Sequence, residues 1–290
     1  MNDKKTKILL IPNRTKNIDR AKIEELYEKL LSLGCGIGLL SRDRDYFTES
    51  ISPEIVATRN ELSEMSAAVV LGGDGSIIEA AHILLGTGVP IIGINFGHVG
   101  FLSELEAGEI SEITKLVSGE YTTEERMMLE ADIEDADGKT VRCFHVLNDI
   151  VLTNGPIARL IGFDVYCDGV KIESCRADGV IASTPTGSTA YSLSAGGPVL
   201  EPSLEGICLT PICPHTLSSR PVIFRPAAEL RISGIKSNNS GVYLNADGRD
   251  VLPLNDGMTV RIKRSPYTTP LIRLGGAGFL DVLHMKLSDN

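Results

Sequence analysis

A glycine-rich turn with one acidic residue constrains the fold of this chain more than any other feature. The turn is Gly72-Gly73-Asp74-Gly75-Ser76, and the apolar residues 67–71 before it predict a buried strand. After the turn, apolar residues recur at helical spacing as far as residue 85. A strand, a glycine turn and a helix in this order predict part of an α/β domain with a parallel sheet.

The same turn indicates a site for phosphate chemistry. The backbone N–H groups of Gly72, Gly73, Gly75 and Ser76 can approach a phosphate closely at the positive end of the helix dipole. Asp74 is the unusual member, because a carboxylate repels phosphate unless it faces a cation, a hydroxyl that it can deprotonate, or a ribose. The alternative is that Asp74 only caps the helix, since Asp is a favoured N-cap residue. The turn favours phosphoryl transfer over simple phosphate binding.

The first part of the chain alternates predicted strands and helices. Residues 7–12 predict a short strand, and residues 20–33 place apolar side chains on one helical face, with Gly34 positioned to end that helix. After the strand at residues 67–71 and its helix, another strand is predicted at residues 89–94 and a further helix at residues 111–117. This order predicts βαβ units, in which helices cover the faces of a parallel sheet.

From about Met127 the apolar period changes to that of strands. Alternating apolar residues are separated by turns such as the hairpin-like Asp168-Gly169, which predicts a β-sandwich or a pair of stacked sheets. Residues 279–287 have helical spacing again. We therefore expect an α/β domain at residues 1–122, a β-sandwich at residues 123–268, and a C-terminal segment at residues 269–290 that packs back onto the first domain.

The composition limits which partners the chain can have. A net charge of −10 over 290 residues argues against a nucleic-acid binder, so a polyanionic ligand must meet local positive groups or a metal ion. No apolar run reaches the roughly 20 residues that span a bilayer, and the first residues have no signal-peptide core, so we expect no membrane contact. The six cysteines are scattered without a C-x-x-C pair, which is typical of reduced thiols in a cytoplasmic protein.

A second candidate motif, residues 184–198, follows the apolar stretch after Asp178 and Gly179. It reads Thr-Pro-Thr-Gly-Ser-Thr-Ala-Tyr-Ser-Leu-Ser-Ala-Gly-Gly-Pro. Its small residues let a ligand approach the backbone, and its hydroxyls can bond to phosphate, ribose or base edges. Tyr191 can stack on a planar ring or fill the core. The alternative for the whole segment is a polar loop that caps a helix.

Several polar residues outside the two motifs are weaker candidates. Asn148 and Asp149 lie between apolar stretches, where either a hairpin corner or a ribose-binding pair explains them. Asp247 belongs to an Asp-Gly pair, which is common in turns. Arg159 and Arg176 can clamp phosphates in an otherwise acidic protein, although an arginine on a strand is more often solvated or ion-paired.

The motifs together resemble the NAD kinase family, in order and spacing along nearly the whole chain. The resemblance rests on the turn with Asp74, on Asn148-Asp149, on residues 178–198 and on Asp247-Gly248, with residues 211–221 as further support. It implies an α/β domain, a β-sandwich and a site in the crevice between them. It also implies transfer of the γ-phosphate of ATP, or of polyphosphate, to the 2′-hydroxyl of the adenosine ribose of NAD. The implied cofactor is a divalent cation, Mg²⁺, carried by the nucleotide with no direct protein ligand, and the implied assembly is a homodimer or homotetramer.

The resemblance assigns roles position by position. Asp74 matches the family's catalytic aspartate, a general base on the ribose hydroxyl. The positions that match NAD contacts, including two less certain ones at the end, are Gly75, Asn148, Asp149, Arg176, Asp178, Thr189, Ala190, Tyr191, Ser192, Leu193, Ser194, Arg159 and Asp247. The chain departs from the family at Asp149, where Glu is frequent, at Arg249, where Gln is common, and at Leu102, where an aromatic is sometimes found. These departures leave the preference between NAD and NADH open.

Two other functions compete with this interpretation. A lipid or sugar kinase of the wider superfamily shares the first motif but lacks residues 184–198 in this form. A non-catalytic dinucleotide sensor on the same scaffold would lack the catalytic acid, whereas Asp74 is present. Formation of NADP from NAD and ATP discriminates among the three.

Overall fold

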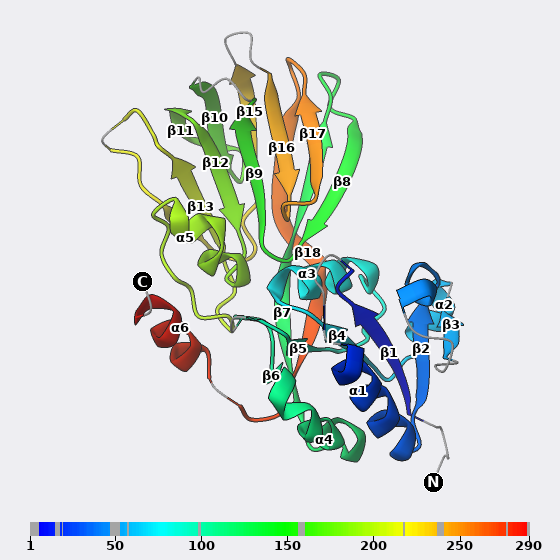
Figure 1. Ribbon diagram of the computed structural model, residues 1–290. Coiled ribbons are helices and arrows are strands. Elements are labelled where there is room, and N and C mark those ends of the chain that lie inside the picture. Colours follow the sequence, from blue (N-terminus) through cyan, green and yellow to red (C-terminus); the bar gives the residue numbers. More distant parts are fainter. Residues whose placement is uncertain are drawn as a thin grey trace. The chain divides into compact units, whose positions relative to one another are not determined.

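The computed structural model (Figure 1) describes residues 6–14, 18, 20–46, 53–56, 58–97, 100–155, 160–216, 218–236, 241–276 and 278–288. The chain forms two compact units. Unit 1 comprises Met1–Glu125 and Thr269–Asn290, and unit 2 comprises Arg126–Thr268. Each unit has its own core.

Unit 1 is built on a mostly parallel sheet. Its strands are β1 (Lys7–Pro12), β2 (Gly36–Leu40), β3 (Glu54–Val56), β4 (Ala67–Leu71), β5 (Ile91–Asn95) and the short β6 (Leu105–Glu106). They lie in the order β3-β2-β1-β4-β5, with β6 beside β5, and the last part of β18 (Thr259–Arg273) pairs in parallel with β5 through Leu271 and Ile91. The predicted α/β class is confirmed.

The helices of unit 1 follow the strands as βαβ topology requires. They are α1 (Arg20–Ser32), η1 (Ser41–Tyr46), α2 (Arg59–Ser63), α3 (Asp74–Ile83), η2 (Ala107–Glu112), α4 (Ile113–Ser118) and α6 (Phe279–Ser288). The single helix predicted at residues 111–117 was wrong in its start. A capping box between Glu106 and Glu109 begins a 3-10 turn at Ala107, and α4 continues from it.

The core of unit 1 explains why its central strands are apolar throughout. All five residues of β4 and of β5 are buried, as expected for a parallel sheet covered on both faces. Leu26 and Leu30 of α1 pack into the same cluster as Leu10 and Ile92. None of the helices in the described part of the chain has the length and apolar character that crossing a bilayer requires.

Unit 2 is an antiparallel sandwich of two sheets. One sheet has the order β14 (Val222–Phe224), β13 (Ile207–Ile212), β12 (Gly179–Ser183), β9 (Asp149–Asn154), β16 (Val242–Ala246) and β17 (Asp250–Leu254). The other has the order β11 (Val170–Ala177), β10 (Ile161–Cys167), β15 (Leu230–Lys236) and β18, and β7 (Thr122–Glu134) pairs with β18 and with β8 (Thr140–Val146). Buried residues of both sheets form one core, which confirms the predicted β-sandwich.

The connections between the strands of unit 2 show which of the predicted turn residues lie at hairpins. Asp168 and Gly169 both have positive φ, +50° and +81°, and join β10 to β11 as the predicted hairpin. Asp247 and Gly248, at +51° and +69°, likewise join β16 to β17. Asn148, in contrast, is not at a hairpin corner. The strand before it, β8, belongs to one sheet and the strand after it, β9, to the other.

Candidate active site

The glycine turn lies at the point of the parallel sheet where successive strands begin to be added on the opposite side. From β1 the chain continues outward through β2 to β3, whereas from β4 it continues in the opposite direction to β5. Asn13 follows β1 and Gly72 follows β4, and these two strands are neighbours. Ligands of open α/β sheets bind beyond the carboxyl ends of the strands at such a switch point, because the two connections leave in opposite directions there.

The turn is held against β1 by side-chain and backbone hydrogen bonds. Asn13 donates its Nδ2 to Oγ of the buried Ser76 at 2.7 Å, and its backbone N–H donates to the Leu71 carbonyl at 2.8 Å. Gly73 is the N-cap of α3 and makes no side-chain capping bond. The alternative that Asp74 merely caps this helix is wrong, since Asp74 is the first helical residue and its carboxylate bonds elsewhere.

The Asp74 carboxylate is oriented by a segment distant in sequence. The backbone N–H of Phe101 donates to Oδ2 at 2.9 Å, and that of Leu102 donates to Oδ1 at 3.0 Å. A Cβ at Gly100 would overlap Oδ1 of Asp74, so only glycine allows this close approach. Each carboxylate oxygen accepts only one of these two N–H groups, so each keeps a further lone pair for a ligand.

The C-terminal helix contacts the residue that holds Asp74. The ring centroid of Phe279, in α6, lies 6.1 Å from that of Phe101, and the Lys286 ammonium lies 4.4 Å from the Phe101 ring centroid. Helix α6 thus packs against the segment that holds Asp74.

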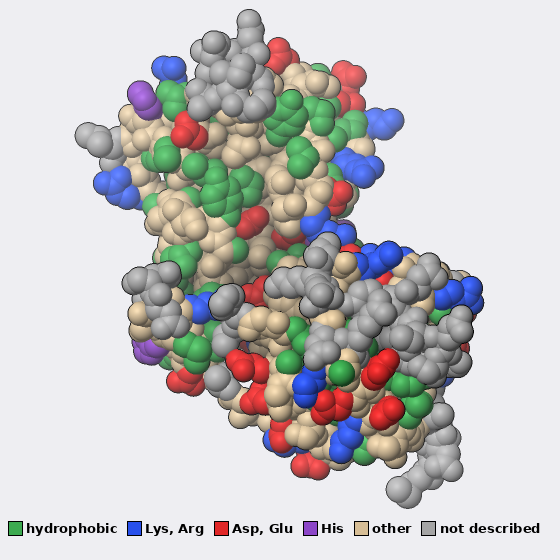
Figure 2. All heavy atoms as spheres, viewed as in Figure 1, with side chains coloured by type: hydrophobic (Ala, Val, Ile, Leu, Met, Phe, Trp, Pro, Cys, Tyr) green, Lys and Arg blue, Asp and Glu red, His purple; other side chains and the backbone are tan. Residues whose placement is uncertain are grey.

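A cavity of about 430 Å³ opens at the turn. It is lined by the end of β1 and the two residues after it, by the turn, by α3 and by the start of η1, namely Pro12, Asn13, Arg14, Arg42, Gly73, Asp74, Gly75, Ser76 and Glu79. Figure 2 shows acidic side chains interspersed with basic ones over the face of unit 1 that carries α1, in keeping with the net charge of −10. Arg14 and Arg42 are the two basic residues that line the cavity.

The two arginines share a buried acid. Oδ1 of the fully buried Asp43 lies 4.0 Å from Nε of Arg14 and 3.8 Å from Nε of Arg42. Burial raises the pKa of Asp43, although both guanidinium groups oppose this shift. Arg42 also pairs with Glu79 at 2.6 Å. The sequence analysis missed Arg14 and Arg42. Their positions in the sequence could have indicated them, because each arginine follows a parallel strand that ends at the same edge of the sheet as β4.

In unit 2, Asp247 holds the segment that contains Asn148 and Asp149. Its carboxylate accepts the backbone N–H groups of Leu147 at 2.8 Å, Asn148 at 2.8 Å and Asp149 at 3.0 Å, while its own N–H donates to the Asp149 carbonyl at 3.0 Å. The Oδ1 of Asn148 is buried without a hydrogen-bond partner within the described ranges. The structure thus brings three predicted residues together, and it gives Asp247 the part of a positioning residue.

Asp149 is a buried acid beside another acid. It is 6% exposed, and burial, reinforced by the Asp247 carboxylate, raises the pKa of Asp149 to about 7. A group with such a pKa changes charge near neutral pH, which is frequent at functional sites.

The hydroxyls of residues 184–198 mostly bond within the protein. Thr184 donates to the Leu147 carbonyl at 2.5 Å, Ser188 donates to the Pro185 carbonyl at 2.6 Å, and the Ser192 hydroxyl lies 2.9 Å from that of Thr210. The side chains of Thr184, Ser188 and Ser192 are all buried. Their role in this structure is therefore to shape η3 (Thr186–Thr189) and α5 (Tyr191–Ser194), which replace the single polar loop of the alternative interpretation.

The remaining predicted contacts differ in exposure. Tyr191 is 44% exposed, which excludes the core position that the sequence left open. Thr189, Ala190 and Leu193 are half-buried and Ser194 is exposed, and a Cβ at Gly187 would overlap the Asn148 carbonyl, so this motif packs directly on Asn148.

Arg176 lies near the end of β11, and Asp178 connects β11 of one sheet to β12 of the other. Asp178 is half-buried and Arg176 is exposed. Arg159 lies outside the described residues. A residue that the sequence analysis missed is Arg126, which is buried and donates to the Thr186 hydroxyl at 3.3 Å. No local pattern marks it, because it follows the charged residues Glu124 and Glu125 and looks like one more exposed charge.

Two family models match most of the chain. The ATP-NAD kinase N-terminal domain matches residues 14–121, and the ATP-NAD kinase C-terminal domain matches residues 147–274. The chain belongs to the NAD kinase family. It is a phosphotransferase that phosphorylates NAD with ATP, which confirms the predicted activity and distinguishes the chain from lipid and sugar kinases.

Individual NAD kinases support the assignment over the full length. The NAD kinase of Symbiobacterium thermophilum is 40% identical over 97% of this chain and 99% of its own length. That of Caldanaerobacter subterraneus subsp. tengcongensis is 37% identical over 98% and 99%. Yeast NADH kinase complexed with NADH has a TM-score of 0.86 at 25% identity, over 99% of this chain and 88% of that one. An Archaeoglobus fulgidus NAD kinase in complex with ATP shares the fold, with a TM-score of 0.74 at 24% identity over 98% and 100%.

Proposed function

We propose that this chain transfers the γ-phosphate of ATP to the 2′-hydroxyl of the adenosine ribose of NAD, with Asp74 as the general base. The observation that carries the proposal is the Asp74 carboxylate, held by two backbone N–H groups at the edge of a cavity that Arg14 and Arg42 also line. A base needs a fixed orientation, and a polyphosphate needs positive groups next to it.

The reaction balances around Asp74. The ribose 2′-oxygen forms a bond to the γ-phosphorus as the bond from that phosphorus to the β,γ-bridging oxygen breaks, and ADP leaves. The hydroxyl proton passes to the Asp74 carboxylate. Arg14, Arg42 and the N–H groups of Gly73 and Gly75 bind and orient the phosphates, which is the larger part of catalysis in phosphoryl transfer. The N–H groups of Gly72 and Ser76, also predicted to bind phosphate, instead donate to the Ile94 and Gly73 carbonyls.

The oxygen-rich lining of the cavity fits a hard cation carried by the nucleotide. The carboxylates of Asp74 and Glu79 line it, so a hydrated Mg²⁺ carried on the nucleotide phosphates would meet negative charge there without a direct protein ligand. When bound, Mg²⁺ would neutralise phosphate charge and polarise the γ-phosphoryl group.

For the dinucleotide, we propose contacts from unit 2. Asn148, Asp149, Asp178, Thr189, Ala190, Tyr191, Leu193, Ser194 and Arg176 are the candidates, with Gly75 from unit 1. The unpartnered Oδ1 of Asn148 and the exposed ring of Tyr191 support contacts to polar groups and to a planar ring, respectively. For Ser192 we propose a backbone contact, because its hydroxyl is bonded to Thr210. Arg159 and Asp247 complete the set, Asp247 acting through the segment that it holds.

The cellular setting belongs to the same proposal. All six cysteine thiols are free, which suits a cytoplasmic protein. We propose a homodimer or homotetramer and no nucleic-acid partner. Exposed apolar residues on the end strands support self-association, namely Val170 and Ile172 of β11 and Val222 and Ile223 of β14. Analytical ultracentrifugation checks the oligomeric state.

A coupled assay tests the activity. The chain is incubated with Mg²⁺, with ATP or polyphosphate as donor and NAD or NADH as acceptor, and NADP(H) is measured with an NADP-specific dehydrogenase. We expect NADP from NAD and ATP. Binding of NAD by calorimetry without NADP formation under any donor would instead support a non-catalytic sensor.

A further inference from the structure

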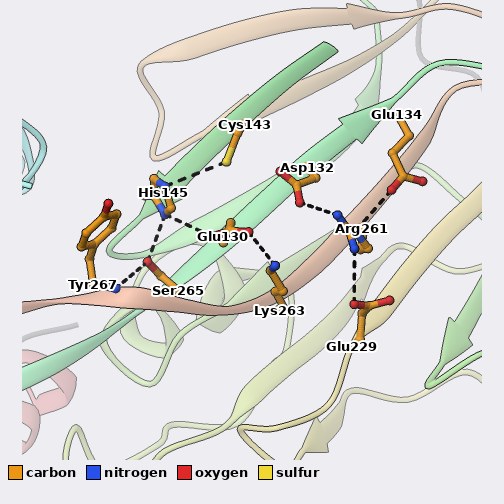
Figure 3. Close-up of polar contacts among 10 residues, drawn as sticks. All are labelled: Glu130, Asp132, Glu134, Cys143, His145, Glu229, Arg261, Lys263, Ser265 and Tyr267. Atoms are coloured by element: carbon orange, nitrogen blue, oxygen red, sulfur yellow. Dashed lines mark hydrogen bonds and ion pairs between the residues drawn. The ribbon is translucent and has the colours of Figure 1, made fainter. Parts of the chain in front are cut away.

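A cluster of metal-ligating side chains lies in unit 2, outside every residue used above. It consists of Glu130 on β7 and of Cys143 and His145 on β8. One ligand atom from each residue, a carboxylate oxygen, the Cys143 sulfur and a His145 nitrogen, can be chosen so that all three lie within 4.8 Å of one another. Figure 3 shows the His145 side chain between those of Cys143 and Glu130, with a contact to each.

The strand pairing creates this arrangement. Glu130 stands opposite His145, and Cys143 lies two residues before His145, so the period of a β-strand puts all three on one face. The neighbours of Glu130 on β7, Leu129 and Ala131, point into the sandwich core. The cluster therefore occupies the outer face of a sheet whose inner face is fixed by packing.

The surrounding contacts orient the three side chains of the cluster. Lys263 pairs with Oε1 of Glu130 at 2.8 Å, which leaves Oε2 on the side of His145, 3.9 Å from Nδ1. Nδ1 of His145 lies 3.0 Å from Oγ of Ser265, while Nε2 faces the Cys143 sulfur at 3.9 Å. A hydrogen-bond partner on one ring nitrogen is the usual arrangement for a histidine that binds a metal through the other.

We propose that Glu130, Cys143 and His145 bind a zinc ion. Zinc bonds of about 2.0–2.3 Å place two ligand atoms of a tetrahedral site about 3.3–3.7 Å apart. The Cys143 sulfur, 3.9 Å from Nε2 of His145, is near that spacing, and rotation of the Glu130 side chain by about 1 Å would complete it. A thiolate, an imidazole and a carboxylate together favour zinc over Mg²⁺, which prefers oxygen ligands alone. The fourth position falls to solvent, because Cys143 is exposed and Asp132 is held by Arg261 at 2.8 Å.

Two carboxylates would balance the charge of a bound dication. Glu130 belongs to the cluster, and Asp132 stands opposite Cys143 in the pairing of β7 with β8. Such an ion would connect β7 to β8 and so stabilise their pairing.

Zinc binding by the full chain tests this proposal. After chelator treatment, wild type, Cys143→Ser and Cys213→Ser are dialysed against Zn²⁺ in excess Mg²⁺, which occupies sites made of oxygen ligands. Cys213 is also an exposed free thiol, so its variant is the matched control. We expect one more zinc per chain in wild type and Cys213→Ser than in Cys143→Ser. Equal zinc content in all three variants would overturn the site.

Two further measurements test the site without relying on the folding of Cys143→Ser, and they distinguish metal ligands from residues that only orient them. Titration of the unaltered chain with Co²⁺ should produce a thiolate-to-cobalt charge-transfer band, and its absence contradicts the proposal without any mutation. Ser265→Ala should keep the stoichiometry but weaken zinc affinity by about 10–100-fold, because Ser265 orients His145. An unchanged affinity of Ser265→Ala would overturn the assigned orientation of the His145 ring.

Discussion

The backbone N–H of Phe101 donates to Oδ2 of Asp74 at 2.9 Å, which couples the proposed base to a segment 27 residues further along the chain. Leu102 makes the matching bond to Oδ1. A carboxylate fixed in this way keeps one orientation toward a hydroxyl instead of rotating, and fixed orientation is a large part of enzymatic rate enhancement.

The first prediction concerns Asp74 itself. Asp74→Asn keeps a carbonyl oxygen for one of the two N–H groups but cannot accept the ribose proton. We expect turnover to fall at least about 100-fold with little loss of NAD affinity, as measured by the coupled assay and by calorimetry. Asp256→Asn removes an exposed carboxylate in unit 2 and serves as the control. Near-normal turnover of Asp74→Asn would remove Asp74 as the base.

The second prediction concerns Gly100, whose missing side chain makes room for Asp74. Gly100→Ala places a methyl group where Oδ1 of Asp74 lies, so either the carboxylate or the loop must move. A displacement of about 1 Å near the reacting atoms can cost about 100-fold in rate, and we expect a loss of up to that size. Gly108→Ala is the matched control because its new methyl group meets open space. Equal rates in both variants contradict the prediction.

A third prediction tests the contact between α6 and Phe101. Phe279→Ala removes the ring that packs 6.1 Å from that of Phe101, and an aromatic pair contributes about 0.5–1.5 kcal/mol. We expect kcat to fall up to about tenfold as Asp74 loses its fixed orientation. Leu280→Ala, on the exposed side of the same helix, should leave kcat unchanged. The idea fails if the two variants behave alike.

The fourth prediction concerns the two arginines of the cavity. Arg14→Ala and Arg42→Ala each remove a group that can make charge-assisted hydrogen bonds to phosphate, worth about 1.5–3 kcal/mol. We expect the KM for ATP to rise about 10–100-fold, with a much smaller change in the KM for NAD. Arg44→Ala, in the same 3-10 helix but outside the cavity lining, is the control. A rise in the KM for NAD alone would place these arginines at the other substrate.

The fifth prediction is a pH dependence of stability. The pKa of Asp149 is raised from 3.8 to about 7 in the folded chain. Between pH 3.8 and pH 7 the folded state therefore binds a proton at Asp149 that the unfolded state does not bind. Its contribution to stability is present at low pH and is lost as pH rises through 7. Relative to Asp149→Asn, wild type should lose up to about 1.4 kcal/mol per pH unit over that range.

Denaturant unfolding at several pH values between 5 and 8 measures this difference. Asp137→Asn, which changes an exposed acid in a turn, is the matched control. A constant difference between wild type and Asp149→Asn across the range would contradict the raised pKa.

Much of the fold could be predicted from local sequence. The strand at residues 7–12 coincides with β1 (Lys7–Pro12), and the apolar residues before the glycine turn coincide with β4 (Ala67–Leu71). Strand β2 (Gly36–Leu40) was missed because Gly36 and Gly38 lower the strand propensity of a five-residue segment. Its burial is supplied by the neighbouring strands, which a local pattern does not contain.

The sequence by itself determined the class of both domains, the family and the identity of the proposed base, because periodicity, turn residues and motifs are local properties. Only the tertiary structure decided which groups meet. Arg14 and Arg42 join Gly73 because parallel strands end at one edge, and Asp247 reaches Asn148 because β9 and β16 pair. The Thr184 and Ser192 hydroxyls turn inward because buried polar groups need partners, and those partners, Leu147 and Thr210, are distant in sequence.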